Sequence, residues 1–176
     1  LQIIDGLPLL VHVLKRSLMS KKLDKIVVCT DSIKVVNLVR KYNQDAYLTS
    51  KNIKNGTDRI SIFLGKNKKK FNNVKLVVDI QCDEIFLNPD YLDKAINFHL
   101  NNLKKYDVVI PHTLTKEENN NSYVKIICNK NNNILYLTRA DAPHAFRSKI
   151  KPFLRHQDFV TFRPDFIKKF KDLKNR

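Results

Sequence analysis

The chain has 176 residues, 43% of them hydrophobic, and its 33 Lys and Arg against 17 Asp and Glu give a formal net charge of +16. This length predicts one domain over residues 1–176 with a real hydrophobic core, and no apolar run is long enough to span a bilayer. We therefore expect a cytoplasmic protein without a membrane partner. The basic residues are dispersed, and the densest run, residues 66–70, contains no aromatic residue. This argues against a nucleic-acid partner and favours attraction of a phosphate-bearing substrate.

Strands and helices alternate along the first part of the chain. Apolar residues spaced as on one helix face predict helices, and Val-rich apolar runs predict buried strands. Asp31 and Ser32 stand where they can cap the second helix. The elements expected here are helices over residues 8–20, 33–42 and 60–64, and strands over residues 25–30 and 45–50.

A polar loop, residues 54–59, precedes the third of these helices. It contains Gly56, one of only three glycines in the chain. Such a loop can bring backbone N–H groups towards an anion or a ribose. Asn-Gly is also a common turn dipeptide, so this observation alone leaves a plain turn open.

The most informative stretch is residues 74–84, an apolar run that ends in polar side chains. The run predicts a strand buried on both faces, and it is followed by Gln81, Asp83 and Glu84. The end of a buried strand in an open α/β sheet is a standard place for a ligand site. Two acids beside a Gln suit Mg2+, which takes oxygen ligands and shares them with substrate phosphates. The alternative is that both acids only solvate the strand end.

The second half of the chain departs from this alternation. A helix over residues 89–105 and a strand over 106–111 continue it, and together they predict an α/β fold with a mostly parallel sheet flanked by helices. A β-hairpin and a further strand then form an inserted region before a last helix that starts at Pro164. The strand is expected to expose Phe159 and Phe162. The hairpin strands are expected at residues 124–128 and 134–138, and the further strand at 153–163.

Cys29 and Cys128 lie within apolar runs and are read as buried thiols. The histidines show no metal-binding spacing. Two of them stand close in sequence to three arginines, which would suit an acidic sugar. The alternatives for that region are a solvated basic face or a dimer contact. The residues concerned are His144, His156, Arg139, Arg147 and Arg155.

Six short stretches along the chain match the motifs of one family. Two are Gln81-Cys-Asp-Glu84, similar to a Gln-Gly-Asp-Glu-Pro motif, and Asn55-Gly-Thr-Asp-Arg59, similar to a Ser-Gly-Thr-Asp/Glu-Arg loop. The others are Asp5-Gly-Leu-Pro-Leu-Leu-Val-His12, Tyr123-Val-Lys-Ile126, Leu135-Tyr-Leu-Thr-Arg-Ala140 and Phe153-Leu-Arg-His156. In their order and separations over nearly the whole chain, these stretches resemble the 3-deoxy-manno-octulosonate (KDO) cytidylyltransferases or CMP-KDO synthetases.

The resemblance implies a nucleotide-diphospho-sugar-transferase-like fold and a homodimer. It also implies a reaction in which the anomeric hydroxyl of KDO attacks the α-phosphate of CTP, releasing pyrophosphate and giving CMP-KDO for lipopolysaccharide synthesis, with Mg2+ as cofactor. By position, Asp83 would be the metal ligand and, with Gln81, a catalytic residue. Gln81, Arg139 and His156 would contact the sugar. The nucleotide would be bound by Asn55, Gly56, Thr57, Asp58 and Arg59.

The resemblance also implies two segments that these 176 residues do not contain. A phosphate-binding segment would stand before Leu1, and a C-terminal part with a second metal-binding Asp would follow Arg176. We therefore expect a fragment at both ends that makes no CMP-sugar as written. Cys82 and Ile85 replace the family's Gly and Pro. Two alternatives stay open: a cytidylyltransferase for another, sialic-acid-like sugar, and a degenerate, non-catalytic nucleotide-binding domain.

Overall fold

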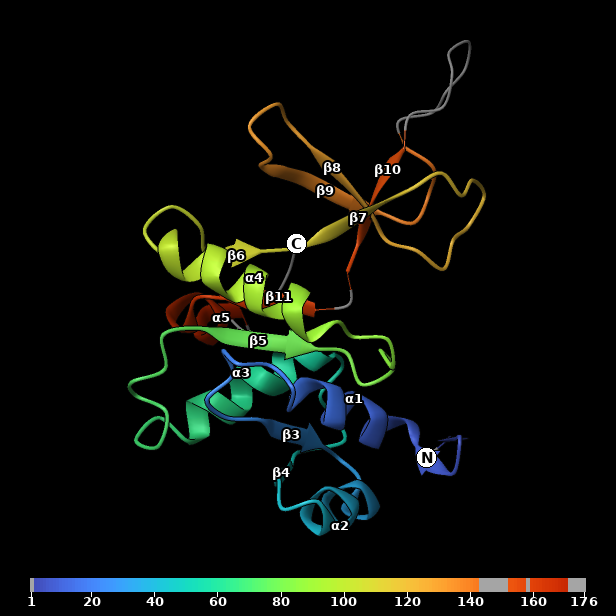
Figure 1. Cartoon of the computed structure of the whole chain (residues 1–176). Coiled ribbons are helices and arrows are strands. Elements are labelled where there is room, and N and C mark those ends of the chain that lie inside the picture. The colour runs from blue at the N-terminus through green and yellow to red at the C-terminus, as the bar shows by residue number, and fades with distance from the viewer. Residues whose placement is uncertain (1, 143–151, 158, 171–176) are drawn as a thin grey trace. The chain divides into compact units, whose positions relative to one another are not determined.

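The computed structural model describes residues 2–142, 152–157 and 159–170 (Figure 1). The described residues divide into two compact units. Unit 1 contains those up to Val109 and those from Phe159 onwards, and unit 2 contains those between Ile110 and Gln157. The expectation of a single cytidylyltransferase-like domain over residues 1–176 is not tested by this division and remains a prediction.

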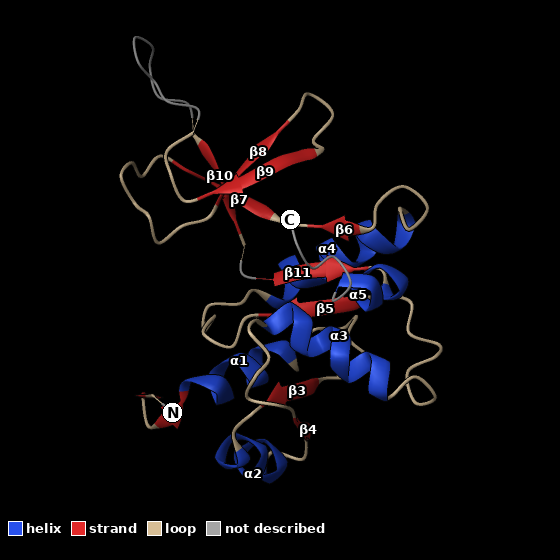
Figure 2. Cartoon of the chain, turned by 180° about the vertical axis from the view of Figure 1, so that it is seen from behind, coloured by secondary structure: helices blue, strands red, loops and turns tan. Residues whose placement is uncertain are grey.

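Unit 1 contains helices and short strands that alternate along the chain (Figure 2). Its helices are α1 (Leu9–Ser17), α2 (Ile33–Lys41), α3 (Gly56–Lys66), α4 (Pro89–Asn101) and α5 (Pro164–Phe170). Its strands are β1 (Ile3–Ile4), β2 (Leu7–Pro8), β3 (Val27–Thr30), β4 (Asp45–Leu48), β5 (Val77–Ile80), β6 (Val108–Val109) and β11 (Phe159–Phe162).

The predicted helices are confirmed, although α3 begins at Gly56, within the stretch expected to be a loop. The reason is a cap: the side chain of Asn55 accepts a hydrogen bond from the amide of Asp58. Ser32 precedes α2 as expected, but its side chain makes no capping bond.

The strands of unit 1 combine parallel and antiparallel pairing, and the expected α/β class is confirmed. β3 pairs with β4 in parallel. β11 lies between β5 and β6 and is antiparallel to both, so β5 and β6 run in the same direction without pairing directly. Because β11 follows an excursion through unit 2, alternation of strands and helices in the sequence could not indicate its place.

Unit 2 is an antiparallel sheet with the strand order β7-β10-β8-β9. Its strands are β7 (His112–Thr115), β8 (Lys125–Cys128), β9 (Ile134–Thr138) and β10 (Phe153–His156). β8 and β9 form the predicted hairpin. Its turn is closed by the amide of Asn129, which donates to the carbonyl of Asn133 over 2.9 Å, and Asn132 takes a φ of 60°.

The single strand expected over residues 153–163 is wrong. The structure has two strands there, β10 in unit 2 and β11 in unit 1. The expected exposure of Phe159 and Phe162 is also wrong, because they are 2% and 5% exposed. Phe159 packs in a cluster with Leu92 and Ile96 of α4, and Phe162 packs with Phe63 of α3. Helices pack against β11 at both positions, α4 at Phe159 and α3 at Phe162, so these apolar side chains belong to the core.

Candidate active site

One cavity of about 1070 Å³ in unit 1 extends to the carboxyl-terminal ends of β3 and β5. Four of the residues predicted from the sequence contribute to its lining, namely Gly56, Arg59, Gln81 and Asp83. Gly56 and Arg59 come from the first turns of α3, whereas Gln81 and Asp83 follow β5. The structure therefore brings the polar loop and the acidic strand end to one place, as ligand sites in α/β sheets require.

Thr57 connects these two segments directly. Its hydroxyl, in the first turn of α3, donates a 3.0 Å hydrogen bond to Oδ2 of Asp79 in β5. Asp79 also lines the cavity, and it is 6% exposed. Burial raises the pKa of the Asp79 carboxyl, and the Thr57 bond opposes this by favouring the charged form. Sequence reasoning missed Asp79, although an acid within an apolar run was a usable signal.

Asn55 and Asp58 bond to each other at the start of α3. Oδ1 of Asn55 accepts from the Asp58 amide at 2.8 Å, and Nδ2 of Asn55 donates to Asp58 Oδ2 at 2.9 Å. Both are outside the lining of the cavity. They cap the helix and place a negative charge at its positive end, which stabilises the first turn. This turn holds Gly56 and Thr57 in position.

Arg59 joins the loops that follow β3 and β4. Nη2 of Arg59 lies 3.2 Å from Oδ2 of Asp31, and Nη1 donates to the hydroxyl of Thr49 and, at 3.4 Å, to the carbonyl of Ser50. The planar guanidinium can hold several acceptors at once, which a Lys ammonium cannot do in the same geometry. We read Arg59 as a residue that positions the loops around the site, in addition to lining the cavity.

The acidic stretch lies in a turn, not in the strand itself. β5 ends at Ile80, and Gln81 and Asp83 are exposed. The amide of Ile85 donates to the carbonyl of Asp83 at 3.1 Å, which closes the turn. The carboxylate of Asp83 thus remains accessible to a ligand that enters the cavity.

Cys29 of β3 lines the same cavity. Burial raises the pKa of its thiol to about 12. The thiol is therefore protonated at neutral pH and is not a nucleophile, since nucleophilic attack requires the thiolate. The thiols of Cys29 and Cys128, which were expected to be buried, are both half-buried in the structure.

Of the three residues predicted to contact the sugar, Arg139 and His156 belong to unit 2, whereas Gln81 belongs to unit 1. Nη1 of Arg139 donates to the carbonyls of Asn121 and Ser122 at 3.0 and 2.8 Å. His156 ends β10, where it pairs with His112 of β7. Arg139 and His156 are in a different unit from Asp83, and neither contributes to the lining of the cavity. Of the other three residues considered there, His144 and Arg147 lie outside the described residues. Arg155 lies in β10, and its guanidinium carbon is 3.6 Å from the centroid of the Tyr123 ring.

A buried cation organises the loop that Arg139 contacts. Lys125 is 0% exposed, and its Nζ lies 2.8 Å from Oδ1 of Asp141. The same ammonium donates to the carbonyls of Asn120 and Arg139 at 3.0 and 3.1 Å. Three acceptors for three N–H groups compensate for the loss of solvation.

Comparison with known proteins decides the family. A family model described as cytidylyltransferase matches residues 1–176. The chain belongs to the cytidylyltransferase family. One relative is a 3-deoxy-manno-octulosonate cytidylyltransferase of a Nitratiruptor species, 26% identical over 174 residues that make up 95% of this chain and 69% of the relative. Another is an 8-amino-3,8-dideoxy-manno-octulosonate cytidylyltransferase of Shewanella pealeana, 27% identical over 176 residues, 97% of this chain and 70% of the relative.

The fold of this cytidylyltransferase is also found in a solved structure. A CMP:2-keto-3-deoxy-manno-octonic acid synthetase in complex with CTP superimposes with a TM-score of 0.88 at 22% sequence identity, covering 100% of this chain and 71% of the other. This confirms the expected fold class. The predicted family membership is confirmed as well, and the chain is an enzyme of the cytidylyltransferase type.

The donor groups of this cytidylyltransferase allow a test of the expected Mg2+. Within the described residues, no group of three or more His, Cys, Asp and Glu side chains is placed to hold a metal ion. Mg2+ commonly uses only one or two carboxylates, with water and substrate phosphates as its other ligands. Asp83 beside the Gln81 amide fits that mode of binding.

Among the described residues, no helix is both long and apolar enough to cross a bilayer.

Proposed function

We propose that this cytidylyltransferase transfers CMP from CTP to the anomeric hydroxyl of 3-deoxy-manno-octulosonate. In this reaction the hydroxyl oxygen forms a bond to the α-phosphorus of CTP. The bond between the α-phosphorus and the bridging oxygen of the β-phosphate breaks, pyrophosphate leaves, and the hydroxyl proton passes to solvent. A relative named for this substrate is similar over 95% of the chain, and this observation carries the proposal.

The cavity at the ends of β3 and β5 is the proposed nucleotide site. Gly56 and Thr57 stand at the start of an 11-residue helix, where backbone N–H groups and the helix dipole favour a phosphate. The carboxyl of Asp79 in β5 accepts a hydrogen bond from the Thr57 hydroxyl and fixes the position of Thr57. Catalysis of phosphoryl-type transfer depends mainly on positioning and on compensation of negative charge.

Asp83 is the proposed ligand of Mg2+, with Gln81 beside it. When bound, the ion neutralises charge on the phosphate oxygens. Exposed Asp83 can exchange water for such an ion without a large desolvation cost, whereas buried Asp79 is better suited to position Thr57.

A specific observation favours a second candidate for the sugar. The Shewanella relative is named for the 8-amino-3,8-dideoxy sugar and is as similar to this chain as the Nitratiruptor relative. The two sugars differ by a hydroxyl against an amine, which is positively charged at neutral pH. A carboxylate near that group would favour the amino sugar, and an Arg or Lys would disfavour it.

The test is release of pyrophosphate from CTP and Mg2+ with each sugar in turn. From the version extended at both ends we expect turnover with 3-deoxy-manno-octulosonate, slower turnover with the amino sugar, and none with a sialic acid. Faster turnover with the amino sugar would reassign the substrate. The assay is run on the 176-residue chain and on a version extended at both ends. If the extended version releases no pyrophosphate with any acidic sugar, the result would support the alternative of a degenerate, non-catalytic domain.

We also propose that the enzyme is a cytoplasmic homodimer that serves lipopolysaccharide synthesis. We infer the cytoplasmic location from the proposed use of CTP as a substrate. The dimer is supported by β9, an edge strand of unit 2 with a row of exposed apolar side chains. An exposed apolar edge strand such as β9 can pair with a strand of another copy of the chain. The residues are Ile134, Leu135, Tyr136 and Leu137.

A further inference from the structure

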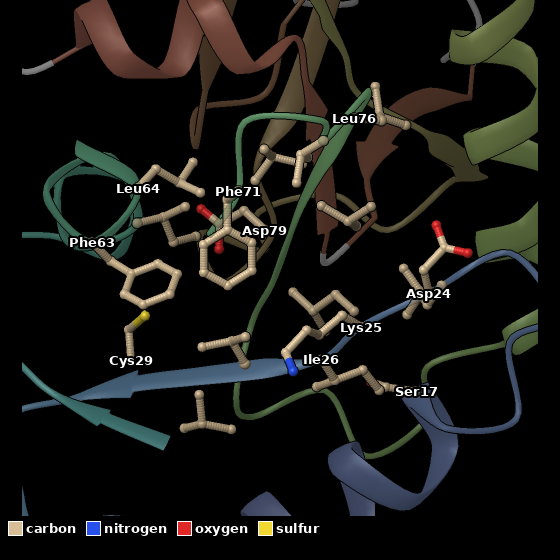
Figure 3. A pocket seen from close by; sticks show the side chains of 18 of the residues that line it. Ser17, Asp24, Lys25, Ile26, Cys29, Phe63, Leu64, Phe71, Leu76 and Asp79 are labelled. Atoms are coloured by element: carbon tan, nitrogen blue, oxygen red, sulfur yellow. The ribbon is translucent and has the colours of Figure 1, made fainter. Parts of the chain in front are cut away.

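Helix α1 lies next to the turn that carries the proposed metal ligand. This turn covers residues 81–88, between the end of β5 and the start of α4, and we call it the acidic turn. Ser17 of α1 lines the same cavity as Asp79 of β5 (Figure 3), and Gln81 and Asp83 of the acidic turn line it as well. Helix α1 and the acidic turn are therefore neighbours at the candidate site.

The hydrogen bonds inside the acidic turn are short in range. The amide of Ile85 donates to the carbonyl of Asp83 at 3.1 Å, and the amide of Leu87 donates to the carbonyl of Glu84 at 3.2 Å. The amide of Glu84 donates to the carbonyl of Gln81 at 3.4 Å. Each of these bonds bends the chain locally but does not fix where the turn lies in unit 1. The position of Asp83 therefore depends on contacts between the turn and its neighbours.

Arg16 of α1 makes such a contact. Its Nε donates a hydrogen bond to the carbonyl of Leu87, the last residue but one of the acidic turn. The side chain of Leu87 is buried and packs with Leu92 and Ile96 of α4. The side chain of Asn88 caps the first amides of α4, so Arg16 and Asn88 hold neighbouring groups of the chain. Because the donor is charged, the bond to the Leu87 carbonyl is stronger than one between neutral groups.

A second contact joins α1 to α4 without involving the acidic turn. The hydroxyl of Ser20 donates to Oδ1 of Asp93 in α4, and the amide of Lys21 donates to Oδ2 of Asp93 at 2.9 Å. The packing of the two helices therefore does not depend on Arg16 alone. The bond of Arg16 differs from this contact because its acceptor belongs to the acidic turn.

We propose that Arg16 is a positioning residue, which holds the acidic turn so that the carboxylate of Asp83 is presented to the cation. This role rests on the proposed function, in which Asp83 binds Mg2+. Such a site depends on the exact position of its carboxylate, since Mg2+ requires near-ideal octahedral geometry at short distances. The sequence gave no sign of Arg16, because its acceptor is a backbone carbonyl 71 positions away.

The test compares three variants of the version of the chain that is extended at both ends. Arg16→Met keeps an unbranched stem and removes the donor, and Arg16→Lys restores a cationic donor. Ser20→Ala is the matched control, since it removes a bond between α1 and α4 that does not involve the acidic turn. Amide hydrogen exchange at Ile85 and Leu87 reports on the turn without turnover. The Mg2+ dependence of pyrophosphate release reports on the bound cation.

We expect Arg16→Met to speed the exchange of both amides about tenfold. The Mg2+ concentration that gives half-maximal velocity should also rise about tenfold, as is common when a group that orients a metal ligand is lost. Arg16→Lys should restore most of both values, and Ser20→Ala should change neither. A merely structural role would lower the folded fraction and hence kcat, but would not move the half-saturating Mg2+ concentration.

The proposal is overturned if the two amides exchange at the parent rate in Arg16→Met, or if Ser20→Ala speeds them equally. It is also overturned if their exchange is faster but the half-saturating Mg2+ concentration is unchanged. Failure of the proposed function gives a different result. An extended parent that releases no pyrophosphate with any acidic sugar would refute CMP transfer, whereas amide exchange would still decide whether Arg16 holds the acidic turn.

Discussion

The hydroxyl of Thr57 donates a 3.0 Å hydrogen bond to the buried carboxylate of Asp79, and this bond ties the first turn of α3 to β5. The two residues are 22 positions apart in the chain. Their contact places the glycine-containing turn beside the acidic turn that follows β5. The geometry of the proposed nucleotide site depends on it.

Replacing Asp79 by Asn is expected to stabilise the fold at neutral pH. Burial raises the pKa of Asp79 above its ordinary value of 3.8. The folded protein therefore holds the proton of the Asp79 carboxyl more tightly than the unfolded chain does. The stabilisation that this proton provides is fully present below pH 3.8, and it is lost as the pH rises through the folded-state pKa of Asp79. Asn is uncharged at all these pH values and still accepts from Thr57. Urea unfolding at neutral pH should show the gain, and at about pH 3 the two proteins should be equally stable.

Thr57→Val is the matched change on the other side of the bond, with Thr57→Ser as control. Removing the hydroxyl should raise the pKa of Asp79 further, because the lost hydrogen bond favoured the charged form. The Ser variant should keep the wild-type pKa. Titration of the Asp79 carboxyl by NMR measures both. Equal values in the Val and Ser variants would contradict the bond.

Asp83→Asn is expected to remove most CMP-sugar synthesis in the active, extended protein without loss of stability. Asp83 is exposed in its turn, so its neutralisation costs little folding free energy, but the proposed Mg2+ ligand is lost. Glu118→Gln removes the same charge from an exposed position in unit 2 and should retain activity. Pyrophosphate release is the measurement. Near-normal turnover by the Asn variant would exclude Asp83 from the site.

Arg59→Lys is expected to destabilise unit 1 by about 1–3 kcal/mol, because one ammonium cannot replace the bonds to Asp31, Thr49 and Ser50. The partner change is Asp31→Ala. A double-mutant cycle of unfolding free energies should show that the two changes are coupled. Strict additivity would mean that the ion pair of Arg59 and Asp31 contributes nothing to stability, which is the case for many exposed ion pairs.

Leu135→Glu tests the proposed dimer. Leu135 is 62% exposed on the edge strand β9, so a charge there should not disturb the fold of unit 2 but should oppose pairing of two copies. Light scattering should report a dimer for the parent chain and a monomer for the variant. A parent chain that is monomeric at high concentration would contradict the proposal.

The sequence alone determined the elements whose signals are local. Helices α1, α2 and α4 follow from apolar spacing within a few turns, and the β8–β9 hairpin follows from two apolar runs around an Asn-rich turn. The motifs of residues 55–59 and 81–84 indicated the family because the chemistry of a site is carried by short segments in order. Each of these inferences needs only neighbours in the chain.

The tertiary structure decided everything that depends on distant partners. Asp79 acquired its role only when β5 was placed beside α3, and Phe159 was buried only when β11 was placed against α4. Strand pairing joins backbone groups, which are the same for every residue except proline, so the side-chain pattern does not encode which strands meet.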